Sequence, residues 1–94
     1  MNVTIDFETR SEVNLKKVGL SRYAKDPTTR VLCMAYQFEG DDTPRVWVPG
    51  EPFPFDDPSN LIFHAHNAAF EMAIWNDTCT RLYGWPEIVD DLEI

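Results

Sequence analysis

Two carboxylates stand out in a segment that otherwise has the composition of a buried strand. Asp6 and Glu8 lie within residues 3–9, among apolar neighbours. In a strand, side chains at positions i and i+2 point to the same face, about 7 Å apart, so both acids face one side and Ile5 and Phe7 pack on the other. Such a pair attracts a hard cation such as Mg²⁺, which one or two carboxylates can hold together with waters and phosphates. A solvated strand end explains the same spacing.

A third acid follows the expected junction between a strand and a helix. Asn67 is a favoured N-cap residue, so a helix is expected to begin there. Glu71 falls in or beside the first turn, where the helix dipole favours a carboxylate. That structural role is sufficient for Glu71 alone. Taken together with Asp6 and Glu8, however, it brings three carboxylates to the ends of neighbouring strands and predicts a metal site.

Apolar runs and turn residues predict the elements that position these acids. Strands are expected at residues 2–7, 31–38, 45–48 and 61–66. The run 31–38 is nearly continuous and predicts a strand covered on both faces. The turn cluster after it predicts an antiparallel hairpin with 45–48.

Helical segments are expected in two regions. Short turns before Pro27 are split by Gly19. The helix from Asn67 places Phe70 on its core face, and residues 76–77 and then 84–86 are expected to end it. Prolines in the loop before Asn60 exclude a central strand but leave room for a short helical turn. The tail 87–94 fits either the start of a strand or a frayed end.

Length and composition favour a single domain that spans residues 1–94. The chain is 44% hydrophobic and 13% aromatic, with no apolar run near the ~18 residues of a membrane span. The N-terminal residues have no secretory signal pattern, so no membrane association and a cytoplasmic location, in bacteria or in a phage-infected host, are expected.

The remaining reactive residue types predict structural roles. Cys33 and Cys79 are far apart and belong to no C-x-x-C motif, so two reduced thiols are expected. His64 and His66 alternate along a strand and are interpreted as core or edge residues in preference to metal ligands. The three tryptophans are interpreted as core or interface residues.

The distribution of charge bears on nucleic-acid binding. A formal net charge of −8 argues against it, because phosphate contacts need Lys and Arg. Six of the 8 basic residues nevertheless fall in the connection behind the acidic pair, which makes that connection the candidate phosphate-facing surface. A solvated loop explains them equally well. These six are Arg10, Lys16, Lys17, Arg22, Lys25 and Arg30.

Both acidic segments resemble motifs of one enzyme family. Residues 5–9 resemble the first motif, D-x-E-T, of the DEDD or DnaQ-like 3′-to-5′ exonucleases. Residues 66–71 are similar to the second motif, in which an Asn precedes an aromatic residue and an acid. The longer pattern, which adds residues 10–12, 15–19, 23–24 and 74–76, resembles the proofreading exonuclease domain of phage-type family A DNA polymerases. The resemblance covers most of residues 2–86.

The resemblance implies a two-metal nuclease site. Asp6 and Glu8 would hold Mg²⁺ or Mn²⁺, and Glu71 would supply a further carboxylate. The implied reaction is in-line attack of an activated water on the terminal phosphodiester of a single-stranded DNA 3′ end.

The resemblance also implies substrate contacts and a fold. Thr9 would contact the 3′-terminal nucleotide, Asn67 would brace the junction or the substrate strand, and Phe70 would also lie against the substrate. The implied fold is α/β and ribonuclease H-like. This chain would contribute a three-stranded antiparallel unit, a further strand and at least one helix of its mixed sheet.

Two departures from the family pattern limit the expected activity. The second motif most often carries Asp, whereas Glu71 is one methylene longer. The third motif, a Tyr or His four residues before an Asp, is missing. Tyr83 and Glu87 have the spacing, but Pro86 between them disfavours a shared helix face. Asp90 and Asp91 lack the preceding Tyr or His.

The chain therefore resembles the N-terminal part of such a domain, either an excised piece or a truncated gene product, with weak or absent activity. Two other interpretations stay open. A non-catalytic acidic phage protein would bind a protein partner or mimic DNA charge. Alternatively, the rest of a polymerase chain or a second copy would complete the site, because an incomplete sheet leaves an open edge.

Overall fold

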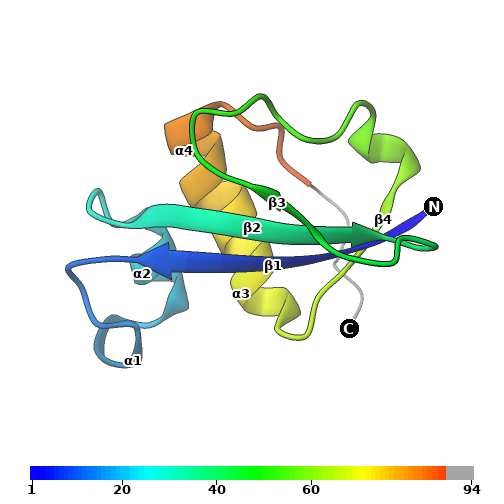
Figure 1. The fold of residues 1–94 in the computed structure, drawn as a ribbon. Helices are drawn as coiled ribbons and strands as arrows, with labels where there is room; N and C mark the ends of the chain where they lie inside the picture. Colours follow the sequence, from blue (N-terminus) through cyan, green and yellow to red (C-terminus); the bar gives the residue numbers. More distant parts are fainter. Residues whose placement is uncertain (89–94) are drawn as a thin grey trace.

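The computed structural model describes residues 1–88, which form a four-stranded mixed sheet with helices packed against one face (Figure 1). The strands lie in the order β3-β2-β1-β4; β1, β2 and β3 are antiparallel neighbours, and β4 runs parallel to β1. The expected α/β class, antiparallel unit and additional strand are confirmed. The elements are β1 (Asn2–Arg10), α1 (Leu15–Val18), α2 (Leu20–Lys25), β2 (Arg30–Phe38), β3 (Arg45–Trp47), η1 (Pro58–Asn60), β4 (Ile62–His64), α3 (Ala68–Ala73), η2 (Ile74–Cys79) and α4 (Thr80–Tyr83).

Strand β1 alternates strictly between the core and solvent. Val3, Ile5 and Phe7 are buried, whereas Asp6 and Glu8 between and beyond them are exposed. The predicted alternation is therefore confirmed. The strand extends beyond the expected end at residue 7 because β2 pairs with it along its whole second half.

Strand β2 corrects the prediction that both of its faces are covered. Val31 and Met34 are buried, but Leu32 is 51% exposed. The register shifts between Glu8, which pairs with Cys33, and Thr9, which pairs with Val31, so Leu32 is the extra residue of a β-bulge. The apolar run in β2 therefore combines residues that pack against the helices on one face with the exposed bulge residue.

Strand β4 is shorter and more exposed than residues 61–66 were expected to be. It pairs with β1 only from Asn2 to Thr4. Phe63 is buried, but Ile62 on the same strand is 50% exposed because β4 is an edge of the sheet. His64 bonds Asn2 through Nε2 and Oδ1 at 2.8 Å, which agrees with its predicted role as an edge residue.

The helical predictions are largely confirmed. Gly19, at φ 84°, separates α1 from α2. The short helical turn that was expected near Asn60 is η1, which precedes β4. Segments α3, η2 and α4 form one continuous helix behind the sheet, of which η2 is a π-helical part (Figure 1). It continues through Asn76, the first expected stop, and ends at the second, where Gly84 takes a left-handed conformation.

An aromatic cluster between the sheet and this helix forms the centre of the core. Trp75 lies in its middle, with ring centroids of four other aromatic residues within 5.9 Å. The predicted core role of the three tryptophans is confirmed. The cluster consists of Trp47, Phe53, Phe55, Phe63, Trp75 and Trp85.

Neither cysteine forms a disulfide within residues 1–88. Cys33 and Cys79 are both free, as predicted, and burial raises the pKa of the Cys79 thiol. No helix within residues 1–88 has the length and hydropathy needed to cross a membrane. Of the expected tail element, Glu87 and Ile88 belong to no helix or strand, and residues 89–94, with Asp90 and Asp91, lie outside the described residues.

Candidate functional site

The two carboxylates of the first motif lie on the uncovered face of the sheet. Asp6 and Glu8 are exposed residues of β1, opposite Ala35 and Cys33 of β2. β1 spans Asn2–Arg10, so neither acid lies at the strand end, which was the alternative explanation of their spacing. The strand thus fixes both acids on one face, at the i, i+2 spacing expected from the sequence.

Glu71 reaches β1 at a point that β4 leaves unpaired. The backbone N–H of Phe7 donates a hydrogen bond to Oε2 of Glu71 at 3.0 Å. Because β4 pairs with β1 only as far as Thr4, the Glu71 carboxylate takes the place of a strand partner there. Glu71 is only 4% exposed. The two motifs, separated by 64 positions at this contact, therefore meet in one buried hydrogen bond.

The environment of Glu71 raises its pKa to about 7. Burial, which disfavours the charged form, is the main cause. The negative charges of Asp6 and Glu8 raise the pKa further, and the hydrogen bond from Phe7 opposes the rise. The three predicted acids therefore share one electrostatic neighbourhood.

The donor atoms are of the kind that bind Mg²⁺ or Mn²⁺, but the complete set is not assembled. Within residues 1–88, no three His, Cys, Asp or Glu side chains lie close enough together to hold a metal ion. One oxygen of Glu71 is engaged by Phe7. A site built from Asp6 and Glu8 still fits the chemistry, because Mg²⁺ is usually bound by one or two carboxylates with waters and phosphates.

The predicted substrate residues are connected through contacts with Tyr23 and Phe70. Thr9 and Phe70 both meet Tyr23 of α2: the Thr9 and Tyr23 hydroxyls bond at 2.8 Å, and the rings of Tyr23 and Phe70 lie 6.5 Å apart. Asn67 is exposed and accepts a hydrogen bond from the backbone N–H of Phe70 at 3.3 Å. Its predicted role as the N-cap is therefore confirmed.

Tyr23 is the residue at this site to which the sequence assigned no role. It is buried, and it links α2 to the acidic strand through Thr9. Its only sequence signal is its place in the longer family pattern. Sequence spacing alone cannot predict that a tyrosine in the short helix α2 bonds to the hydroxyl of Thr9 in β1.

The third motif has no counterpart within residues 1–88. The backbone N–H of Val31 donates to the Tyr83 hydroxyl at 3.3 Å, which gives Tyr83 a structural role. The helix ends at Tyr83, and Glu87 lies beyond Gly84 outside any helix. The prediction that Tyr83 and Glu87 do not share a helix face is confirmed. Asp90 and Asp91 lie outside the described residues.

Comparison of the chain with protein-family models, with curated proteins and with solved structures found no match.

Proposed function

We propose that this chain is part of a metal-dependent 3′-to-5′ exonuclease domain with a ribonuclease H-like fold, which removes nucleotides from a DNA 3′ end. Asp6 and Glu8 are the metal-binding acids, and Glu71 is the third carboxylate. Thr9, Asn67 and Phe70 are the residues that would contact the substrate. Bound Mg²⁺ or Mn²⁺ would activate a water and offset charge on the phosphodiester.

The observation that carries this proposal is the hydrogen bond from Phe7 to Glu71. Phe7 lies between the two acids of the first motif, and Glu71 is the acid of the second. Burial is the main cause of the raised pKa of Glu71, and repulsion from both Asp6 and Glu8 adds to it. A carboxylate so placed is stabilised when a cation supplies the missing positive charge.

The protein residues have separable roles in this scheme. Asp6 and Glu8, exposed on one face, present oxygen ligands to solvent and substrate. Glu71 holds the edge of β1 in place through its hydrogen bond with the Phe7 backbone, and it adds negative charge near Asp6 and Glu8. The Thr9–Tyr23 bond fixes the residue that follows the acidic pair, so a terminal nucleotide would meet a constrained strand.

The test is Mn²⁺-dependent shortening of a single-stranded oligonucleotide labelled at its 5′ end. Asp6→Ala should reduce the rate on the order of 10²-fold or more, because a metal contributes several kcal/mol of transition-state stabilisation. The matched control is Asp42→Ala, which removes an exposed acid in the turn after β2. Circular dichroism establishes that each sample is folded. Equal rates for the Asp6 and Asp42 variants would refute the assignment of Asp6.

One observation favours a second candidate, a non-catalytic acidic module that binds a protein partner or mimics DNA charge. The formal net charge is −8, which disfavours contact with phosphates and favours a partner that carries positive charge. In that case folded wild-type protein leaves the oligonucleotide intact. Partner binding would then be unchanged by Asp6→Ala and would weaken as salt rises.

A further inference from the structure

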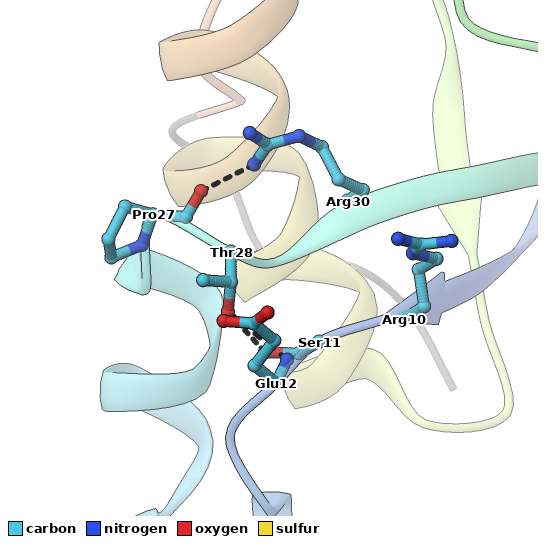
Figure 2. Close-up of a pocket in the computed structure, with 6 residues that line it drawn as sticks. All are labelled: Arg10, Ser11, Glu12, Pro27, Thr28 and Arg30. Carbon is cyan, nitrogen blue, oxygen red and sulfur yellow. Dashed lines mark hydrogen bonds between the residues drawn. The ribbon is translucent and has the colours of Figure 1, made fainter.

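A pocket of about 400 Å³ opens where β1 ends and β2 begins (Figure 2). It lies at the opposite end of β1 from β4, next to the turn that follows α2. Two arginines and two hydroxyl residues contribute to its wall. The lining residues are Arg10, Ser11, Glu12, Pro27, Thr28 and Arg30.

The two arginines face each other across paired strands. Arg10 and Arg30 are direct partners in the antiparallel register, so their side chains leave the sheet on the same face. Like charges in directly opposed positions are destabilising. Neither guanidinium forms a salt bridge within residues 1–88, although the chain has 16 acidic residues. The pocket therefore holds two guanidinium groups that form no salt bridge within the described residues, against one carboxylate, that of Glu12.

Arg30 is held in place, whereas Arg10 is not. Nη1 of Arg30 donates to the carbonyl oxygens of Pro27 and Thr29, as Figure 2 shows for Pro27. Its other N–H groups make no hydrogen bond in the described chain. Arg10 makes no side-chain hydrogen bond there either. A guanidinium presents five donors in a fork that matches phosphate oxygens, so most donors of this pair are available.

Thr28, which lines the pocket, lies in a hydrogen-bonded turn. The Thr28 hydroxyl donates to Oδ1 of Asp26 at 2.6 Å, and the backbone N–H of Glu12 donates to the Thr28 hydroxyl at 3.1 Å. These bonds already engage the Thr28 hydroxyl. The two arginines must therefore supply the hydrogen bonds that bind an anion. The Glu12 carboxylate also lines the pocket and opposes an anion.

We propose that Arg10 and Arg30 form a phosphate-binding site for a backbone phosphate of a nucleic-acid strand. The identity of the ligand as a nucleic acid rests on the proposed function, whereas the presence of the arginine pocket does not. Arg10 continues the exposed row of Asp6 and Glu8, two residues further along β1. A nucleic-acid strand whose 3′ end lies at Asp6 and Glu8 would therefore place a neighbouring phosphate over the two arginines.

The first experiment measures binding of inorganic phosphate to the ¹⁵N-labelled chain by NMR, at low salt and without divalent ions. The Nε–Hε signals of Arg10 and Arg30 should shift more than that of Arg45, which already pairs with Asp41 at 3.3 Å. Shifts of equal size for all three arginines, or no shifts, would overturn the site.

The second experiment distinguishes a nucleic-acid strand from free phosphate. Fluorescence anisotropy of a labelled single-stranded oligothymidylate in EDTA should give tenfold or greater weakening for Arg10→Gln and for Arg30→Gln, as expected for lost charge-assisted hydrogen bonds. Arg45→Gln should stay within about twofold, and Glu12→Gln should bind more tightly. Phosphate shifts without oligothymidylate binding would restrict the site to free phosphate and overturn the nucleic-acid assignment.

These outcomes are independent of the exonuclease assay. Asp6→Ala removes no pocket residue, so phosphate should still shift the Arg10 and Arg30 signals in that variant, whether or not the chain is a nuclease. Arg30→Gln also removes the bonds to Pro27 and Thr29, so its ¹⁵N spectrum must match that of the wild type away from the pocket. Arg10→Gln, which breaks no such bond, provides the second variant.

Discussion

The two faces of the sheet differ in composition and in what covers them. One face packs against the continuous helix through Ile5, Phe7 and the aromatic cluster around Trp75. The other presents Asp6 and Glu8 to solvent. Because the strand period is two, residues that determine the fold and residues that could do chemistry are immediate neighbours in β1.

This difference implies that the two faces respond differently to substitution. Changes on the covered face should cost stability, and changes on the uncovered face should change charge and binding with little cost. Glu71 is the exception, because it is a charged group of the candidate site that is buried on the helix side. Its behaviour therefore connects the two faces.

The largest effect on stability is expected for Trp75→Ala. Trp75 is 0% exposed, stacks on Phe55 at 5.8 Å and donates from Nε1 to the Pro86 carbonyl at 2.7 Å. Removing it should lower the free energy of unfolding by about 3–5 kcal/mol. Urea denaturation checks this value. The control Trp75→Phe keeps an aromatic ring and should cost less; equal costs would show that the hydrogen bond to Pro86 outweighs packing.

A smaller, pH-dependent effect is expected for Glu71→Gln. The pKa of Glu71 is about 7 in the folded chain and 4.5 in the unfolded reference, so the native state holds this proton more tightly. The resulting stabilisation is complete below about pH 4.5 and is lost as the pH rises through 7. The glutamine variant should therefore gain stability relative to wild type over this range, by roughly 3 kcal/mol at most.

The matched control for Glu71→Gln is Asp26→Asn. Hydrogen bonds from Thr28 hold the pKa of Asp26 below its usual 3.8. The stability that Asp26 contributes is therefore complete above about pH 3.8 and is lost at lower pH. Between pH 5 and 8, the difference between Asp26→Asn and wild type should be constant. A flat profile for Glu71→Gln as well would contradict the raised pKa.

Much of the fold could be predicted because local patterns and tertiary structure agree. Alternation in β1, the Gly19 break and the Asn67 cap each have a local physical cause that the structure retains. The coverage of β2 could not be predicted in this way. Its apolar run includes Leu32, whose exposure follows from a bulge in the register with β1, and a register is a property of two strands.

The candidate site was predictable in its residue types but not in its arrangement. The spacing of Asp6 and Glu8 fixed them on one face, and the structure agrees. The contact of Glu71 with the Phe7 backbone depends on where β4 ends, which no local pattern encodes. The pairing of Arg10 with Arg30 depends on the hairpin register in the same way.

The smallest effect is expected for Leu32→Ala, which tests whether the exposed bulge of β2 is free of a covering partner. Leu32 is 51% exposed, so its truncation should change the free energy of unfolding by less than about 0.5 kcal/mol. The control Val31→Ala, one residue earlier and 3% exposed, should cost about 2 kcal/mol. Equal costs in urea denaturation would mean that Leu32 is buried in solution. A midpoint that also rises with protein concentration would identify a second copy as the cover, because association stabilises by mass action.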